Sequence, residues 1–346
     1  MTTEEKPAWD WAETTREALG KFLADHSITQ GPVTTKAIGD GHSNLTYLVS
    51  DGRTEVVVRR PPPPPIPKGA NDVLREATIL TGLGAADFAV PDVLATAEAG
   101  ELLDVPLYVM TFAPGAIVTG QTPSVLATAE RRKSVGHSLV DTLARLHAVD
   151  IAEAGLGDLG RPEGFNLRHI KSMRRLLDHA GGGDDSAFDE LHDWLIDNAP
   201  AESGAAIVHL DYRIGNLVID EATASVQAVL DWELATLGDP LLDLGNFLVS
   251  VPVRGRALNP TAELSRALLE DGYPTREELA ERYAEHTGAD ISRLPWYEAM
   301  SLWKLAVLYE YSRDKAVGGS GDPYYLRPGL VDSFLAEAEE IAGALK

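Results

Sequence analysis

The fold of this chain is decided by the stretch His209-Leu210-Asp211-Tyr212-Arg213-Ile214-Gly215-Asn216 and by a second cluster, Leu230-Asp231-Trp232-Glu233. Mostly apolar residues lead into both clusters, which predicts two short β-strands that end at acidic residues. Asp211 and Asn216 are five positions apart (216 − 211), and Asp231 follows Asn216 after fifteen (231 − 216). We therefore expect two carboxylates and one amide to project from the ends of two strands.

The order and spacing of these side chains are typical of protein kinases, in which a catalytic-loop Asp is followed by a metal-binding Asn and a metal-binding Asp. Transfer of a γ-phosphoryl group requires a carboxylate that orients the accepting hydroxyl and takes its proton, and it requires oxygen ligands for Mg²⁺. Asp211 suits the first task, and Asn216 and Asp231 suit the second. Arg213 stands where many protein kinases place a cation against the transferring phosphate. A lone Asp-x-x-x-x-Asn is a common accident, so the catalytic interpretation depends on Asp231 at the expected separation.

These motifs resemble those of a known family. The segment His209 to Asn216 resembles the H-G-D-x-x-x-x-N loop of the aminoglycoside phosphotransferase family, small-molecule kinases with a protein-kinase-like fold. The segment AVLDWELATLGDP (228–240) is more similar to one branch, the kinase domains fused to certain acyl-CoA dehydrogenases and their free-standing bacterial relatives. The similarity runs from about Ile38 to beyond Asp243, with one departure: the Gly that follows the His in the family is Leu210 here.

The resemblance implies the fold class, the cofactors and the reaction. It implies an α+β, two-lobed protein-kinase-like fold, with a mainly antiparallel β lobe for the nucleotide over residues 1–112 and a mainly helical catalytic and substrate lobe over 113–346. It implies ATP and Mg²⁺, with phosphorylation of a hydroxyl group on a small molecule. Asp211 and Arg213 would be catalytic, and Asn216 and Asp231 would hold the metal.

In the first lobe, the segment GDGHSN (39–44) lies between two predicted strands, 33–38 and 45–50. A strand, a glycine turn and a second strand is the order of the kinase loop that covers the phosphates, whereas a Rossmann turn would open a helix. Gly41, Ser43 and Asn44 are therefore the expected nucleotide contacts of this loop. The alternative is an ordinary hairpin turn.

The third predicted strand, 55–60, contains Arg59 at the position where kinases have a Lys that holds the α- and β-phosphates. Arg at this position resembles the acyl-CoA-dehydrogenase-associated branch, and a planar guanidinium can grip two phosphate oxygens at once. The predicted helix 71–83 offers Glu76 as the partner of Arg59; the alternative is a solvated surface glutamate. The segment YVMTFAPG (108–115) resembles the hinge that binds the adenine edge, which assigns the carbonyl of Thr111 and the amide of Ala113.

Three features of the second lobe have structural interpretations. Asp239 and Pro240 predict the start of a helix, in which Asp243 resembles the buried acid that braces the kinase catalytic loop. The segment GLGDLG (155–160) formally matches G-x-G-x-x-G, but a helix precedes it and Arg-Pro follows, so it does not predict a dinucleotide site. His147 is interpreted as a structural residue at a helix end, and the aromatic residues of the predicted helix 292–315 as core.

Composition sets further bounds. The chain has 346 residues, 44% of them hydrophobic and 24% charged, and no Cys, which is ordinary for a globular protein and fits a cytoplasmic location. No apolar run reaches the length of a membrane span, and the formal net charge of −23 argues against nucleic acid as a partner. The charge favours a cationic acceptor only weakly, because acidic surfaces usually serve solubility.

Two other classes of function remain open from the sequence. A pseudokinase that binds nucleotide or acts as a scaffold would explain Arg59 and Leu210, but the presence of Asp211, Asn216 and Asp231 together argues against it. A hydrolase lacks support, since no nucleophile–base motif is recognisable. For the acceptor we favour a metabolic hydroxyl compound such as a hydroxyacyl thioester over an aminoglycoside, because motifs are local whereas net charge is a bulk property.

Overall fold

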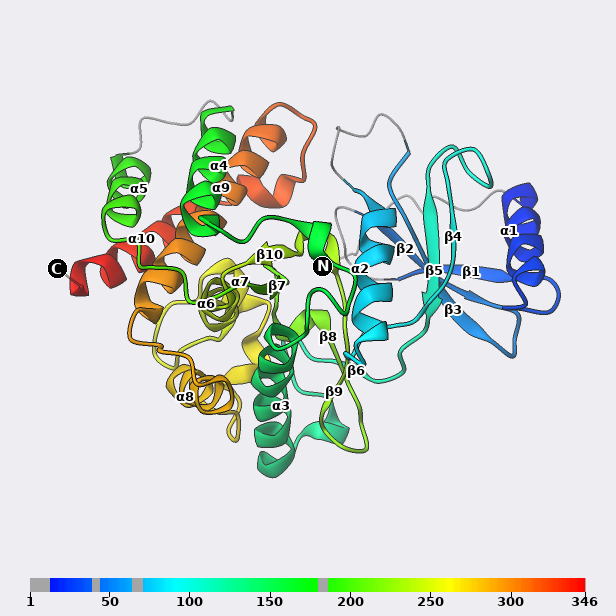
Figure 1. Cartoon of the computed structure of the whole chain (residues 1–346), viewed down its shortest axis with the longest axis horizontal. Coiled ribbons are helices and arrows are strands. Elements are labelled where there is room, and N and C mark those ends of the chain that lie inside the picture. Colours follow the sequence, from blue (N-terminus) through cyan, green and yellow to red (C-terminus); the bar gives the residue numbers. More distant parts are fainter. Residues whose placement is uncertain (1–12, 39–43, 64–70, 180–185, 346) are drawn as a thin grey trace. The chain divides into compact units, whose positions relative to one another are not determined.

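The computed structural model describes residues 13–38, 44–63, 71–179 and 186–345. Gly41 and Ser43, two of the predicted nucleotide contacts, lie outside the described residues. The chain forms two compact units, Met1–Pro114 and Gly115–Lys346 (Figure 1).

The first unit is built on a five-stranded antiparallel sheet in the order β1-β2-β3-β5-β4. β-Branched residues dominate its central strand β3, as expected for a half-buried pleated surface. The bounds are β1 (Thr34–Ile38), β2 (Leu45–Ser50), β3 (Glu55–Arg60), β4 (Val93–Ala97) and β5 (Leu107–Thr111), with helices α1 (Glu13–Asp25) and α2 (Val73–Ala85).

In the described part of this unit, helices α1 and α2 pack on opposite faces of the sheet. Successive side chains of a strand point to opposite faces. On β3, Val56 and Val58 belong to the apolar cluster that includes Leu19 and Leu23 of α1. The side chain of Arg59 points to the opposite face, where it pairs with Glu76 of α2. The alternation of β3 therefore delivers Arg59 to the face that α2 covers.

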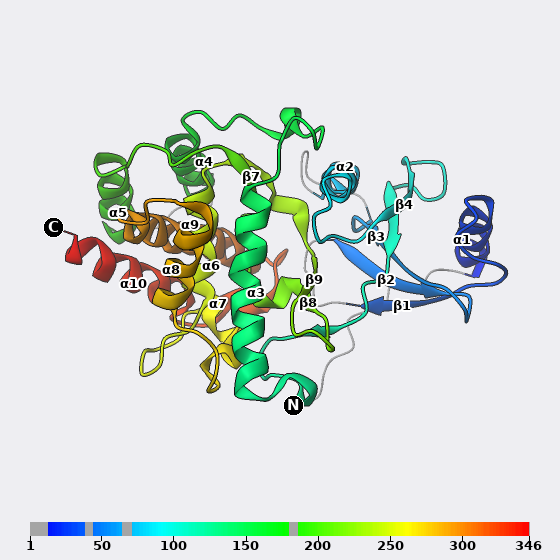
Figure 2. The ribbon, with the colours of Figure 1, turned by 60° about the horizontal axis from the view of Figure 1, so that its bottom comes forward.

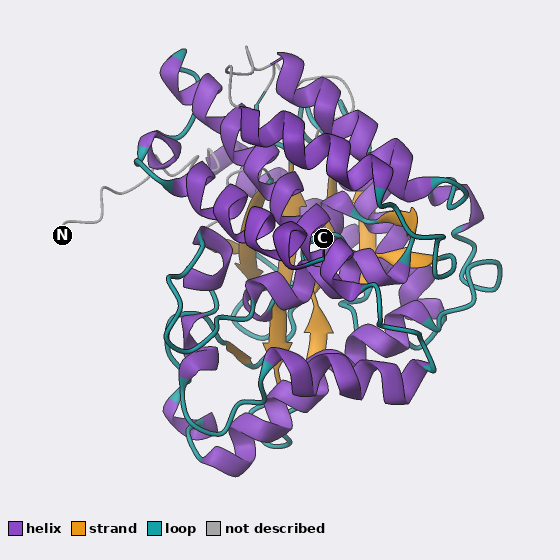
Figure 3. Cartoon of the chain, turned by 90° about the vertical axis from the view of Figure 1, so that its left-hand side faces the viewer, coloured by secondary structure: helices purple, strands orange, loops and turns teal. Residues whose placement is uncertain are grey.

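The second unit consists mostly of helices (Figure 3). Its longest helix, α9, packs against α10, α6, α4 and α5, and α3 runs beside β7 and β9 (Figure 2). The helix bounds are α3 (Ala129–His147), α4 (Phe165–His179), α5 (Ser186–Asp197), α6 (Pro240–Ser250), α7 (Pro260–Glu263), α8 (Arg276–Thr287), α9 (Leu294–Val317) and α10 (Leu330–Ala344).

Short strands in the second unit carry the predicted catalytic segments. They form a two-stranded sheet, β10-β7, and a three-stranded sheet, β6-β8-β9. β7 and β9 are predicted from the sequence, by the apolar residues that lead into the two clusters, whereas β6, β8 and β10 are not predicted. The bounds are β6 (Ala116–Ile117), β7 (Ala206–Val208), β8 (Leu217–Ile219), β9 (Val226–Val229) and β10 (Thr236–Gly238).

Local sequence signals mark the starts of helices α6 and α8. The Asp239 carboxylate accepts a hydrogen bond from the Leu241 amide at 3.1 Å, and Pro240 is the first residue of α6, as predicted. Thr275 and Glu278 form a capping box at the start of α8. The aromatic side chains of α9 are core at three positions, because Trp296, Tyr297 and Trp303 are almost completely buried. No helix in the described part of the chain is both long and apolar enough to cross a membrane.

Glu298 of α9 predicts a pH-dependent stability. Burial raises the pKa of Glu298 to about 7, against the charge of Arg276 and with the charges of Glu337 and Glu277. Because the folded pKa exceeds the unfolded value of 4.5, the stability from the protonated group is present below pH 4.5 and is lost as the pH rises through 7. We expect Glu298→Gln to raise the free energy of unfolding by about 1–3 kcal/mol at pH 8, and hardly at all at pH 4.5. Urea unfolding at both pH values measures this difference, and an equal effect at both would contradict it.

Candidate active site

The loop 209–216 follows β7 and is tied to helix α6 through one buried carboxylate. Asp243 Oδ2 accepts from the His209 amide at 2.6 Å, and Asp243 Oδ1 accepts from the Leu210 amide at 2.8 Å. Burial alone would raise the pKa of Asp243, but hydrogen bonding and charge from His147 and the contacts of His209 hold it below its ordinary value. The predicted brace of the loop by Asp243 is confirmed, and His147 takes the predicted structural place at the end of α3.

Leu210 has a left-handed backbone conformation, with φ of +64°. For a residue with a Cβ this costs about 1–2 kcal/mol, so the surrounding structure must hold it. Its amide is held by Asp243, and its carbonyl accepts from Asn246 Nδ2 at 3.1 Å and Lys304 Nζ at 3.0 Å. The departure from the family's Gly is thus accommodated by hydrogen bonds on both sides of the strained residue.

Asp211, Arg213 and Asn216 are brought together by this loop. Asn216 Nδ2 donates to Asp211 Oδ2 at 2.8 Å and to the Asp211 carbonyl at 2.9 Å. Arg213 Nε lies 3.7 Å from Asp211 Oδ1. A side chain at Gly215 would collide with the Arg213 guanidinium, so the glycine provides the space that Arg213 occupies. The Asp211 carboxylate, whose side chain is 35% exposed, is oriented by an amide and faced by a cation.

Asp231 lies at the end of β9 and is connected to the same loop through the backbone. The Leu230 amide donates to the Asn216 carbonyl at 2.9 Å, and the Leu230 carbonyl accepts from His209 Nε2 at 2.9 Å. His209 Nδ1 accepts from the Asp211 amide at 3.2 Å, so His209 carries its proton on Nε2 and links both clusters. Asp231 itself is left-handed, with φ of +69°, which turns the chain at the strand end.

The donor atoms of this region fit Mg²⁺. Because the amide nitrogen of Asn216 is bonded to Asp211, its amide oxygen is the atom left to act as a ligand. Asp231 adds a carboxylate, and Mg²⁺ is usually held by one or two protein carboxylates together with substrate phosphates and water. Within the described ranges, no group of three or more His, Cys, Asp or Glu side chains could hold a metal ion. One amide oxygen and one carboxylate from the protein fit a metal that also takes phosphate and water ligands.

In the first unit, Arg59 and Glu76 form a buried ion pair. Arg59 Nε lies 2.9 Å from Glu76 Oε2, and the two side chains are 13% and 2% exposed. The pairing predicted from the sequence is confirmed, and the alternative of a solvated Glu76 is wrong. The neighbouring Arg60 lies over the Tyr47 ring instead, at 5.7 Å from its centroid.

Three other residues of this unit that are predicted to contact the nucleotide, Asn44, Thr111 and Ala113, lie in different segments. Asn44 is buried, and its Oδ1 accepts from Asn71 Nδ2 at 3.1 Å, which ties the end of the predicted phosphate loop to the segment before α2. Thr111 ends β5, and its amide donates to the Asp92 carbonyl at 2.9 Å. Ala113 is half-buried in the segment that follows.

The comparison with protein families decides the assignment. A model described as the phosphotransferase enzyme family matches residues 34–296. The chain belongs to this phosphotransferase family. Acyl-CoA dehydrogenase family member 11 of Gallus gallus is 31% identical over 283 residues, which cover 80% of this chain and 36% of the chicken protein. Family member 10 of Mus musculus is 28% identical over 85% of this chain and 28% of its own length. The chain thus spans well under half of these relatives.

Solved structures have the same fold. A Ralstonia eutropha protein provisionally assigned as an aminoglycoside phosphotransferase has a TM-score of 0.79 at 26% identity, covering 95% of this chain and 98% of its own. Aminoglycoside phosphotransferase APH(4)-Ia, solved as a thermostable mutant with AMP-PNP and hygromycin B, has a TM-score of 0.61 at 17% identity, covering 94% and 98%. Macrolide 2'-phosphotransferase MphH of Brachybacterium faecium has a TM-score of 0.57 at 20% identity, covering 93% and 98%. The predicted protein-kinase-like α+β fold is confirmed.

Three residues of the loop's support were missed in the sequence analysis. His209 joins the two clusters, and Asn246 and Lys304 hold the Leu210 carbonyl. A signal for Lys304 exists in the sequence: the positions three and four residues away on the same helical face are Met300, Ser301, Val307 and Leu308. A lysine among such neighbours on a long helix is expected to point into the core and to need a partner.

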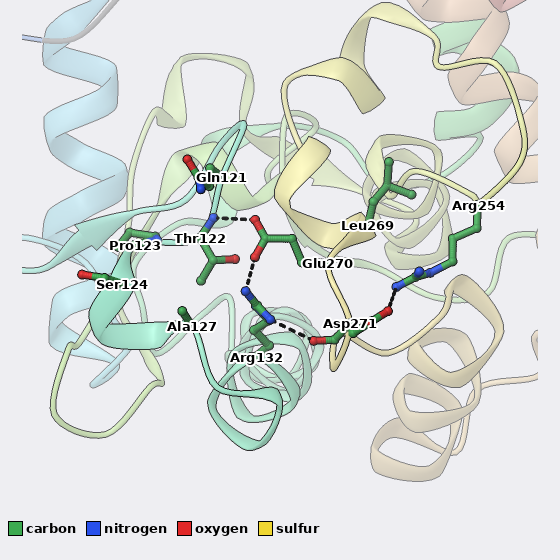
Figure 4. A pocket seen from close by; sticks show the side chains of 10 residues that line it. All are labelled: Gln121, Thr122, Pro123, Ser124, Ala127, Arg132, Arg254, Leu269, Glu270 and Asp271. Atoms are coloured by element: carbon green, nitrogen blue, oxygen red, sulfur yellow. Dashed lines mark hydrogen bonds and ion pairs between the residues drawn. The ribbon is translucent and has the colours of Figure 1, made fainter.

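A separate polar hollow of about 950 Å³ lies in the second unit (Figure 4). Its two arginines are already paired: Arg132 with Glu270, and Arg254 with Asp271 at 2.7 Å. Burial would raise the pKa of Glu270, but the Thr122 amide and hydroxyl and the Arg132 charge hold it below its ordinary value. The hollow is therefore balanced in charge, and none of the predicted site residues is among the residues that line it: Gln121, Thr122, Pro123, Ser124, Ala127, Arg132, Arg254, Leu269, Glu270 and Asp271.

Proposed function

We propose that this phosphotransferase is an ATP- and Mg²⁺-dependent kinase that transfers the γ-phosphoryl group to a hydroxyl of a small molecule. The observation that carries the proposal is the Asp211 carboxylate, oriented by Asn216 at 2.8 Å on a loop bonded through its backbone to the Asp231 segment. This is the arrangement that phosphoryl transfer needs: a base for the acceptor beside oxygen ligands for the metal.

In the proposed reaction, Asp211 Oδ1 or Oδ2 orients the acceptor hydroxyl and takes its proton. The acceptor oxygen forms the new P–O bond, the bond between the γ-phosphorus and the bridging oxygen breaks, and ADP leaves with that oxygen. Arg213, 3.7 Å from Asp211, faces the negative charge of the transferred group. Asn216 and Asp231 would hold Mg²⁺, which neutralises charge on the phosphates when bound.

In the first unit, we propose that the nucleotide is held by Arg59, fixed by Glu76, with Gly41, Ser43 and Asn44 at the phosphates and the backbone of Thr111 and Ala113 at the adenine. The ion pair supports this role for Arg59, because a buried glutamate holds the guanidinium in one orientation, and a fixed planar guanidinium suits phosphate recognition. The complex of a structural neighbour with AMP-PNP supports ATP as the donor.

Arg59→Ala is expected to weaken MgATP binding by about 10–100-fold, because a desolvated charge-assisted contact contributes about 1.5–3 kcal/mol. Arg59→Lys should restore part of the affinity. Arg60→Ala is the matched control, since Arg60 points to the other face of β3 and stacks on Tyr47. Isothermal titration with MgATP measures the three affinities. A larger loss in Arg60→Ala than in Arg59→Ala would contradict the assignment.

For the acceptor, we propose a metabolic hydroxyl compound such as a hydroxyacyl thioester. The similarity to acyl-CoA dehydrogenase family members supports this choice, whereas hygromycin B in a neighbour and the net charge of −23 favour a cationic antibiotic. The neighbour is 17% identical, so its ligand carries less weight than the relatives with local motif similarity.

Steady-state assays with hydroxyacyl thioesters and with kanamycin-type aminoglycosides separate the two acceptors. We expect turnover of a thioester and slow or absent turnover of the antibiotic. A kcat/KM for the antibiotic above about 10⁴ M⁻¹s⁻¹ would contradict the choice of acceptor, while leaving the kinase proposal intact.

A further inference from the structure

Lys304 is a buried cation on α9 whose partners belong to the candidate catalytic loop and its support. Its side chain is only 3% exposed. The ammonium donates to the Leu210 carbonyl at 3.0 Å and to Asn246 Oδ1 at 2.8 Å. Asn246 Nδ2 donates to the same Leu210 carbonyl at 3.1 Å, so the three groups form a closed triangle of hydrogen bonds.

The held carbonyl belongs to the peptide bond that joins Leu210 to Asp211. Its orientation sets the direction in which the Asp211 backbone leaves the left-handed Leu210, and therefore where the Asp211 carboxylate points. Asp243 fixes the other side of Leu210 by accepting from its amide at 2.8 Å. With both sides held, a conformation that costs about 1–2 kcal/mol is maintained immediately before the proposed base.

A lysine at this buried position is energetically unfavourable compared with an apolar residue. Burial of an ammonium is unfavourable unless it is paired, and an apolar side chain of similar size would fill a core position at lower cost. Burial lowers the pKa of Lys304 to about 8, although the charges of Asp211 and Asp243 act to raise it. The charge of Lys304 also acts on His169. Burial and this charge lower the pKa of His169 to about 3, so His169 is neutral. The position therefore keeps a cation near two carboxylates at a substantial free-energy cost.

We propose that Lys304 is a positioning residue for phosphoryl transfer, which acts through the Leu210 carbonyl to hold the Asp211 carboxylate in its reactive orientation. The inference rests on the proposed function of Asp211. It assigns Lys304 no contact with either substrate.

The test compares Lys304→Met, which removes the charge and the donors at similar size, with Lys304→Arg, which keeps them. Lys315→Met is the matched control, because Lys315 is on the same helix but is exposed and lies over the Tyr311 ring. Two measurements do not require the acceptor: ADP release from MgATP with water as the acceptor, and amide hydrogen exchange of the peptide 209–216.

We expect Lys304→Met to lower kcat for ADP release by about 10–100-fold, the scale of a misplaced catalytic group, while KM for MgATP changes by less than about twofold. Exchange of the 209–216 amides should rise about tenfold, with the amides of α10 unchanged. Lys304→Arg should recover part of both losses, and Lys315→Met should match the wild type.

Wild-type kcat and wild-type loop protection in Lys304→Met would overturn the proposal. So would a uniform rise of exchange along the chain, which indicates a role in stability alone. If Lys304→Met does not fold, Lys304→Gln replaces it, and failure of both to fold would also overturn the positioning role. Asp211→Asn tests the proposed function separately: full activity there refutes the kinase mechanism, whereas an inactive Asp211→Asn with an active Lys304→Met refutes only the inference about Lys304.

Discussion

Asp211→Asn is expected to lower turnover by about 10²–10⁴-fold, the usual effect of removing a positioned general base. The amide keeps the size of the carboxylate and can still accept from Asn216 Nδ2, so the loop should keep its conformation. MgATP affinity should therefore change little, because the loss falls on the chemical step.

Turnover and MgATP affinity are to be measured on the same preparation. Asp193→Asn is the matched control, since it makes the same chemical change at a carboxylate of α5 that is 79% exposed. Wild-type turnover in Asp211→Asn would refute the role of Asp211. A large loss in the control would show that the assay reports a nonspecific effect of the substitution.

Asp231→Asn is expected to lower turnover by about 10²-fold or more and to shift the Mg²⁺ requirement to higher concentration. The change removes the anionic side chain that we propose as a metal ligand, and a bound metal ion contributes several kcal/mol to stabilising the charge of the transition state. Asn is chosen because it tolerates the left-handed backbone better than Ala, so the turn after β9 should persist.

The Mg²⁺ dependence of ADP release distinguishes a ligand from a structural residue at position 231. Asp87→Asn is the matched control, since Asp87 is also left-handed, with φ of +56°, and is exposed. An unchanged half-saturating Mg²⁺ concentration together with normal turnover in Asp231→Asn would contradict its assignment as a metal ligand.

Much of the fold could be predicted because strong local patterns coincide with the family motifs. β2 and β3 begin and end where the sequence predicts, since both are rich in residues that favour strands and are bounded by turn signals. The pairing of Arg59 with Glu76 could also be predicted, because the motif specifies a strand-borne cation and a helix-borne acid. The two-lobed architecture could be predicted from the resemblance of these motifs to the family.

The brace of the candidate loop by Asp243 could be predicted, but the hydrogen bonds from Asn246 and Lys304 could not, because they depend on contacts between distant segments. Lys304 is 94 positions from Leu210, and nothing in either local pattern relates the two. The left-handed conformation of Leu210 could not be predicted either, because Leu has no preference for this conformation. The hydrogen bonds that hold it come from the distant helices α6 and α9. The acceptor is the least predictable feature, since its pocket depends on where helices place their side chains.

The central claim is tested most directly by ADP release from MgATP across a panel of hydroxyl compounds, with the wild-type chain and Asp211→Asn side by side. We predict that at least one compound stimulates ADP release by the wild type, that an equal amount of phosphorylated compound is formed, and that Asp211→Asn gives neither. ADP release that no hydroxyl compound stimulates, at a rate that Asp211→Asn leaves unchanged, would contradict the assignment as a small-molecule kinase.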